Sequence, residues 1–191
     1  MKRVFIVHGW GGFPEEGWFP WLKKELESRN IKVEVPSMPN SEEPYIKKWT
    51  NYLSKVVGKA DEDSYFVGHS IGCQTIIRYL ESLPKKVKVG GVIFVAGWFK
   101  LMNLEKEEEE IAKPWLKEDI NYSKVKKHCN NFAAFFSDND YFVSNENINL
   151  FKERIGVKDI IIEKNKGHFS GSDNVTKLPS VLEALLRLIK K

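Results

Sequence analysis

The middle of the chain reads SYFVGHSIG from Ser64 to Gly72. Its last five residues match G-x-S-x-G, the pattern of a nucleophile elbow, in which a sharp turn between a strand and a helix lifts a serine hydroxyl out of the backbone. Tyr65–Val67 have the composition of a buried strand before the motif, and Cys73–Leu83 have the apolar spacing of a helix after it. The sequence therefore predicts that Ser70 is a nucleophile, although a glycine-rich turn with an inert serine would have the same local pattern.

Short apolar runs of the same kind occur at five other places in the chain. They lie at Arg3–Val7, Lys32–Val35, Gly91–Val95, Phe132–Phe136 and Ile160–Ile162. Because these runs do not alternate with polar residues, we expect strands that are buried on both faces. Segments with helical spacing lie between most of them, and Leu178–Ile189 has the apolar face of a last packing helix. The alternation predicts an α/β fold, a three-layer sandwich with a six-stranded, mainly parallel sheet between two layers of helices.

Length and composition favour a single domain formed by residues 1–191. Hydrophobic residues make up 42% and charged residues 29% of the chain, as in globular proteins that fold in water. The formal net charge of +4 comes from 30 basic and 26 acidic residues scattered along the sequence, which does not favour a nucleic-acid partner. No apolar stretch approaches the roughly 20 residues of a membrane helix, so we expect no membrane partner.

The cysteine pattern and the known nucleotide-binding motifs indicate neither a metal nor a cofactor. Cys73 and Cys129 lack the spacing of metal ligands, and the chain contains no P-loop and no dinucleotide fingerprint. Reduced thiols in a cytoplasmic protein are the simplest interpretation of two isolated cysteines. The sequence gives no indication of an oligomeric state.

An alcohol is a weak nucleophile at neutral pH, so Ser70 needs a base, and the base needs a carboxylate to fix its tautomer. Of the four histidines, His168 has the expected position, in a late loop after the Ile160–Ile162 strand. Asp138 and Asp140 both lie just after the Phe132–Phe136 strand, and either carboxylate would keep the order serine, aspartate, histidine that follows such an elbow. A turn-forming role is the alternative for the two aspartates.

Two further groups of residues are candidates for substrate contacts. The loop His8–Gly12 is rich in glycine, so a backbone N–H of Trp10 or a neighbour could form half of an oxyanion hole, with the N–H of Ile71 as the other half. A plain tight turn is the alternative for this loop. Trp98, Phe99 and Phe169 could line an apolar pocket that binds substrate, although aromatic residues more often lie in the core.

The segment Leu101–Tyr122 interrupts the alternation of strands and helices. It contains the acidic run Glu107–Glu110 together with Pro114 and Trp115. The segment could form a small cap over the site, but charge runs more often form a solvated helix face. We expect the solvated face for these charges.

With these residues in place, the chain resembles the small α/β-hydrolase family of predicted serine esterases that includes retinoblastoma-binding protein nine. The resemblance extends over nearly the whole length. It rests on V-x-I-V-H-G-W-G-G from Val4 to Gly12, the Trp18–Leu26 helix, Pro36–Pro44 with Trp49, the G-H-S-I-G elbow, Ala96–Phe99, Asp140–Val143 and Gly167–Phe169.

The resemblance implies a reduced hydrolase fold that begins with the strand before the His-Gly loop and has the strand order 2-1-3-4-5-6. It favours Asp140 over Asp138, since family members carry an aspartate shortly before Val/Leu-Pro, although Ser144 replaces the proline here. It implies metal-free hydrolysis of a small acyl ester or amide through an acyl-serine. The alternatives are a serine aminopeptidase and a binding or scaffold protein that keeps the fold with little turnover. No Leu-x-Cys-x-Glu sequence is present, so we expect no retinoblastoma-protein partner.

Overall fold

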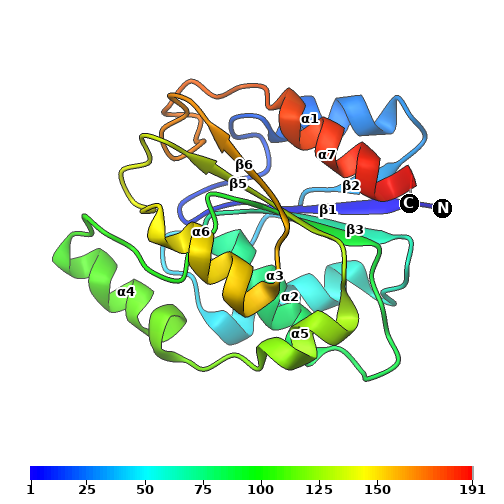
Figure 1. Cartoon of the computed structure of the whole chain (residues 1–191), viewed down its shortest axis with the longest axis horizontal. Helices are drawn as coiled ribbons and strands as arrows, with labels where there is room; N and C mark the ends of the chain where they lie inside the picture. The colour runs from blue at the N-terminus through cyan, green and yellow to red at the C-terminus, as the bar shows by residue number, and fades with distance from the viewer. Residues whose placement is uncertain (191) are drawn as a thin grey trace.

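The computed structural model describes residues 1–190 and has a six-stranded parallel sheet at its centre (Figure 1). The strands are β1 (Arg3–Val7), β2 (Lys32–Glu34), β3 (Ser64–His69), β4 (Gly91–Val95), β5 (Phe132–Ser137) and β6 (Asp159–Glu163). They pair in the order β2-β1-β3-β4-β5-β6, and every pair is parallel. The predicted fold class and strand order are confirmed.

Burial on both faces explains why the inner strands lack alternation. β3, β4 and β5 are buried at every position, and β1 is buried from Val4 onward. The prediction of two buried faces is wrong for β2, where Lys32 is exposed and Glu34 half-buried, and for β6, where Asp159 and Ile162 are exposed. These two strands lie at the sheet edges and each pairs with one neighbour, so less of the molecule covers them.

Helices cover the sheet in two layers (Figure 1). On one face lie α1 (Phe19–Glu27) and α7 (Pro179–Lys190), and on the other α2 (Ile46–Val57), α3 (Ile71–Ser82) and α5 (Tyr122–His128). Successive residues of β1 divide between two hydrophobic clusters, because side chains along a strand point to opposite faces. Val4 and Ile6 pack with α1 and α7, whereas Phe5 and Val7 pack with α2 and α3.

Besides α5, three further elements lie between β4 and β6. They are α4 (Lys106–Lys117), α6 (Glu146–Leu150) and the π-helical turn η1 (Phe151–Ile155). On α4 three of the four glutamates in the acidic run are exposed, which agrees with a solvated face, but Glu108 is half-buried. Trp115 fixes this helix, since its buried ring donates an Nε1–H hydrogen bond to the carbonyl of Pro44 at 2.9 Å. Within residues 1–190 no helix combines the length and apolarity needed to cross a membrane.

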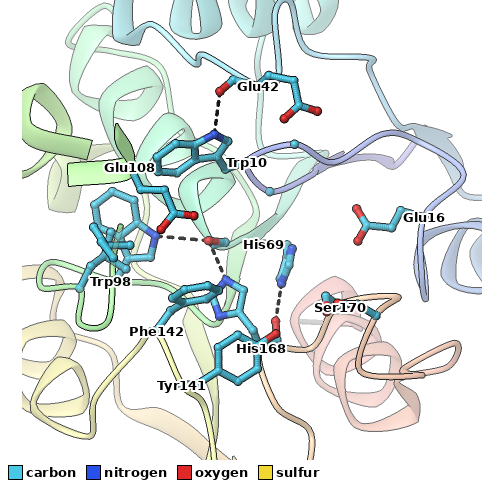
Figure 2. Close-up of a pocket in the computed structure, with 16 residues that line it drawn as sticks. Trp10, Glu16, Glu42, His69, Trp98, Glu108, Tyr141, Phe142, His168 and Ser170 are labelled. Carbon is cyan, nitrogen blue, oxygen red and sulfur yellow. Dashed lines mark hydrogen bonds between the residues drawn. The ribbon is translucent and has the colours of Figure 1, made fainter. Parts of the chain in front are cut away.

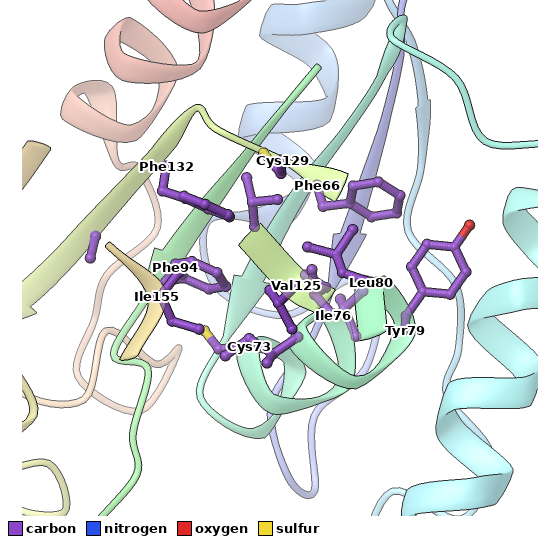
Figure 3. Packing of buried hydrophobic residues seen from close by; sticks show 14 of the residues in the cluster. Phe66, Cys73, Ile76, Tyr79, Leu80, Phe94, Val125, Cys129, Phe132 and Ile155 are labelled. Carbon is purple, nitrogen blue, oxygen red and sulfur yellow. The ribbon is translucent and has the colours of Figure 1, made fainter. Parts of the chain in front are cut away.

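Helix α3 packs against the sheet at very short range. Cys73, Ile76 and Leu80 belong to the buried cluster that also contains Phe66 of β3 and Phe94 of β4 (Figure 3). A Cβ atom at Gly72 would clash with the backbone carbonyl oxygens of Val7 and His8 in β1 and its loop. Helix α3 therefore lies this close to β1 only because residue 72 has no side chain.

We predict that Gly72→Ala destabilises the protein by about 3 kcal/mol, the upper end of the usual cost of overpacking. The added methyl group meets backbone atoms, which cannot turn aside as a side chain can. Urea unfolding followed by circular dichroism measures the change. Asn51→Ala at an exposed position of α2 is the control and should change stability by less than about 0.5 kcal/mol. A loss of under about 1 kcal/mol for Gly72→Ala would contradict the tight packing.

Candidate active site

Ser70 lies in the turn between β3 and α3, at the carboxyl end of the sheet. Its backbone has φ 52° and ψ −121°, a strained conformation for a residue with a side chain. Its N–H donates to the carbonyl of Val95 at 2.9 Å, and its own carbonyl accepts from the N–H of Cys73 at 2.9 Å. Hydrogen bonds on both sides of the residue thus hold the strained turn.

The structure brings together the serine, histidine and aspartate that the sequence separates by up to 98 positions. His168 Nε2 lies 2.9 Å from Ser70 Oγ. On the other side of the imidazole, Nδ1 lies 2.9 Å from Asp140 Oδ2 and 3.1 Å from Oδ1. All three residues are buried, with 7 to 9% of their surface exposed. An imidazole bridging a hydroxyl and a carboxylate is the arrangement that moves a proton away from an attacking oxygen.

The two aspartates after β5 occupy different places. Asp140 Oδ1 accepts hydrogen bonds from the N–H groups of Phe142 at 2.9 Å and Val143 at 3.0 Å, which turn its carboxylate toward His168. Asp138 Oδ1 instead accepts from the N–H of Asn165 at 2.8 Å. Asp140 therefore contacts the imidazole, and Asp138 ties together the loops that follow β5 and β6.

Sequence reasoning missed the residues that shape the loop around His168. Asp173 Oδ2 accepts from the N–H of His168 at 2.9 Å and from the hydroxyl of Ser170 at 2.7 Å. Asn139 Oδ1 accepts from the N–H of Gly167 at 2.9 Å. Asp and Asn side chains commonly cap turns in this way, and the Asp and Asn residues in 138–140 and 173–174 are the available signal.

A cavity of about 320 Å³ opens beside Ser70. Its aromatic lining comes from Trp10, Trp98, Tyr141 and Phe142, and Leu101 and Leu104 add aliphatic surface. Its carboxylates are Glu16, Glu42 and Glu108, and no lysine or arginine of residues 1–190 lines it. The segment before α4 and Glu108 on α4 thus form part of the wall.

The predicted substrate-contacting residues separate into two sets. Trp98 lines the cavity, but Phe99 packs against Phe151 with ring centroids 4.7 Å apart, and the Phe169 ring is fully buried in the opposite cluster. The positive φ of 57° at Phe169 turns its side chain into the core. The structure thus places Phe99 and Phe169 away from the cavity. Tyr141 and Phe142 line the cavity instead, together with Trp10 and Trp98.

The backbone N–H groups proposed for an oxyanion hole are available as donors. Trp10 and Ile71 donate no backbone hydrogen bond to residues 1–190, while the neighbouring N–H of Gly11 donates to Ser41 at 2.8 Å. The side chain of Trp10 is fixed by its own Nε1–H, which donates to the carbonyl of Glu42 at 2.8 Å. Ile71 begins α3, so its N–H lies at the positive end of the helix dipole.

A family model described as serine hydrolase matches residues 4–187, which is nearly the whole chain. The chain belongs to the serine hydrolase family. The family resemblance that the sequence motifs indicated is confirmed.

Curated relatives and solved structures agree with this membership. This serine hydrolase is 29% identical over 190 residues to YdeN of Bacillus subtilis, covering 100% of this chain and 97% of that protein. It is 25% identical over 181 residues to the serine hydrolase RBBP9 of Rattus norvegicus, covering 90% and 89%. The crystal structure of the B. subtilis ydeN gene product superposes with a TM-score of 0.91 at 28% identity, covering 100% of both chains. Est1E of Butyrivibrio proteoclasticus, at a TM-score of 0.74 and 15% identity, covering 100% of this chain and 90% of that chain, shares the fold.

His69, the residue before the serine, is a second imidazole of the hydrolase site. Its Nε2–H donates to the carbonyl of His168 at 2.7 Å, so it fixes the backbone of the other histidine (Figure 2). Burial, with a smaller contribution from the neighbouring His168, lowers the pKa of His69 to about 3. His69 is therefore neutral at physiological pH and acts as a fixed hydrogen-bond donor.

We predict that His69 makes the folded hydrolase less stable in acid. An unfolded histidine takes up a proton below pH 6.5, whereas folded His69 does so only below about pH 3. Stability should fall by about 1.4 kcal/mol per pH unit from this group alone as the pH drops between these values. Urea unfolding between about pH 6 and 4 measures the slope.

His69→Gln is the comparison, because an amide can still donate to the His168 carbonyl but does not titrate. Its stability should decline less steeply with falling pH than that of the wild type. Burial also lowers the pKa of His8, but His8 is present in both proteins, so the difference isolates His69. If stability fell equally steeply with pH in both proteins, folded His69 would take up its proton as readily as the unfolded histidine, which would contradict the prediction.

Proposed function

We propose that this serine hydrolase cleaves carboxylic esters, or small amides, through an acyl-serine intermediate. The supporting observation is the chain of contacts from Ser70 Oγ through both ring nitrogens of His168 to the Asp140 carboxylate, beside an open cavity. The reaction needs a nucleophile, a base beside it and a carboxylate that orients the base, and Ser70, His168 and Asp140 lie in contact in this order. A small-molecule acyl compound fits a cavity of about 320 Å³.

In the acylation step Ser70 Oγ attacks the carbonyl carbon while its proton passes to His168 Nε2. Asp140 stabilises the imidazolium that forms and keeps the other ring proton on Nδ1. The tetrahedral intermediate expels its alcohol or amine, which takes the proton from Nε2. Water then attacks the acyl-serine by the same route, the acid leaves, and Oγ regains its proton.

The N–H groups of Trp10 and Ile71 are the proposed donors to the oxyanion. Both lack another backbone acceptor within residues 1–190; Trp10 lies in the loop after β1, and Ile71 is the first residue of α3. Donors already oriented before the reaction need no reorganisation when charge develops on the carbonyl oxygen. A helix N-terminus behind the Ile71 N–H adds to this stabilisation.

We predict that Ser70→Ala lowers hydrolysis of p-nitrophenyl acetate at least about 10⁴-fold and abolishes labelling by a fluorophosphonate probe. The change removes only the attacking oxygen, so the folded state should persist in circular dichroism. Ser54→Ala, at an exposed position of α2, should keep both activity and labelling. Labelling of the Ser70→Ala protein at the wild-type rate would exclude the acyl-serine route. Absence of turnover in the wild type would favour a binding or scaffold protein.

We also predict that the site discriminates against anionic esters. Glu16, Glu42 and Glu108 line the cavity without a facing lysine or arginine in residues 1–190. At low salt, kcat/KM for p-nitrophenyl butyrate should be about tenfold higher than for p-nitrophenyl hemisuccinate. This butyrate-to-hemisuccinate ratio should shrink as salt screens the charges. Glu108→Gln should reduce the ratio and Glu153→Gln, on the distant η1, should not. Equal kcat/KM values for the two esters at low salt would contradict the prediction.

A further inference from the structure

The serine oxygen has a second partner that the proposed triad does not use. Trp98 follows β4, is 1% exposed, and its Nε1 lies 3.3 Å from Ser70 Oγ. Figure 2 shows the Trp98 and His168 rings turned toward the same hydroxyl, with a dashed line from each to that oxygen. An indole nitrogen can only donate, so Oγ accepts from Trp98 and its own proton is directed to His168 Nε2.

The other tryptophans with hydrogen-bonded rings behave differently. Trp10, Trp18, Trp49 and Trp115 each donate their Nε1–H to a backbone carbonyl. These bonds serve packing, since a buried indole N–H needs an acceptor. Trp98 instead donates to Ser70 Oγ, the attacking oxygen of the proposed reaction.

Hydrogen bonds and close packing fix the backbone around Trp98 so that its indole nitrogen points at Ser70 Oγ. Ala96 has a φ of 47°, which is unfavourable for a residue with a side chain. Gly97 has no room for a Cβ, because Phe151 lies against it. The Trp98 carbonyl accepts from Gln74 Nε2 at 2.6 Å, and the next two N–H groups donate to Asn147 Oδ1 at 2.7 and 3.0 Å. Gln74 lies on α3, so the helix that begins at the nucleophile also fixes the donor.

We propose that the indole N–H of Trp98 is a further catalytic donor, which stabilises negative charge on Ser70 Oγ in both halves of the reaction. This inference rests on the proposed acyl-serine route. Charge grows on Oγ when its proton moves to His168 Nε2 during attack. It grows again in deacylation, when the bond from Oγ to the acyl carbon breaks and the electron pair returns to Oγ before Nε2 returns the proton. The indole keeps its own proton throughout.

A donor in this position favours the transition state over the resting enzyme. A hydrogen bond to a charged oxygen is roughly twice as strong as one to a neutral hydroxyl. Only an interaction that is stronger in the transition state than in the resting enzyme accelerates the chemical step. The buried ring keeps the donor oriented and keeps water from competing for it.

The test removes the N–H while keeping an aromatic ring. Trp98→Phe and site-specific replacement of Trp98 by 3-benzothienylalanine, which has sulfur in place of the N–H, are compared with the wild type on p-nitrophenyl acetate. We expect kcat to fall about tenfold to thirtyfold in both proteins, with KM within about twofold of the wild type. Trp49→Phe loses an N–H bond to the carbonyl of Pro39 and is the control, with kcat expected to stay within about twofold.

Two results would overturn the inference while leaving the proposed function intact. One is a benzothienylalanine protein with wild-type kcat, which would show that ring shape rather than the N–H matters. The other is a loss that appears in KM alone, which would assign Trp98 to substrate binding. Failure of the proposed function looks different, because the Ser70→Ala protein would then match the wild type, and the role of Trp98 would fall with it.

Discussion

The close contact between α3 and β1 is the constraint on which the rest of the site depends. Gly72 lies against the carbonyl oxygens of Val7 and His8, and this contact allows the chain to turn from β3 directly into the helix. The turn forces Ser70 into a conformation with positive φ and leaves its hydroxyl at the carboxyl end of the sheet. The hydrogen bond from the Ser70 N–H to Val95 ties the same turn to β4, so neighbouring strands on both sides fix one residue.

Strand order then determines which loops surround that hydroxyl. The strands beside β3 are β1, which leads into the loop with Trp10, and β4, which leads to Trp98. Asp140 and His168 come from the loops after β5 and β6, farther along the sheet, and therefore need additional ties. Hydrogen bonds from the 165–167 backbone to Asp138, Ser137 and Asn139 supply them. Polar contacts between the two loops thus help to position the imidazole, together with the neighbouring Phe169, whose ring is buried in the core.

The sequence predicted the elements whose signal is local and missed those that depend on side-chain direction. Apolar runs located all six strands, and the glycine spacing located Ser70, because both patterns arise from residues close in sequence. Residues alone left Asp138 and Asp140 as alternatives, since both follow β5 within three positions and only their contacts separate them. Phe99 and Phe169 show the same limit, because composition identifies an aromatic residue but not whether its ring points into the cavity or into the core, as both of these rings do. The short segments α5, α6 and η1 have too few residues for a helical period to emerge.

Burial divides the carboxylates of the site into two kinds with different effects. Asp140 is 8% exposed and accepts two backbone N–H groups, so its charge acts on His168 through a poorly polarisable interior. Glu42 is exposed and Glu16 and Glu108 are half-buried, so water and salt weaken the electrostatic interaction between these carboxylates and the imidazole. The buried carboxylate can therefore stabilise the imidazolium of the proposed reaction, while the wetter ones act on whatever occupies the cavity. The proposed ester or amide hydrolysis would leave an anionic acid beside those three glutamates, so their negative charges would favour release of the product.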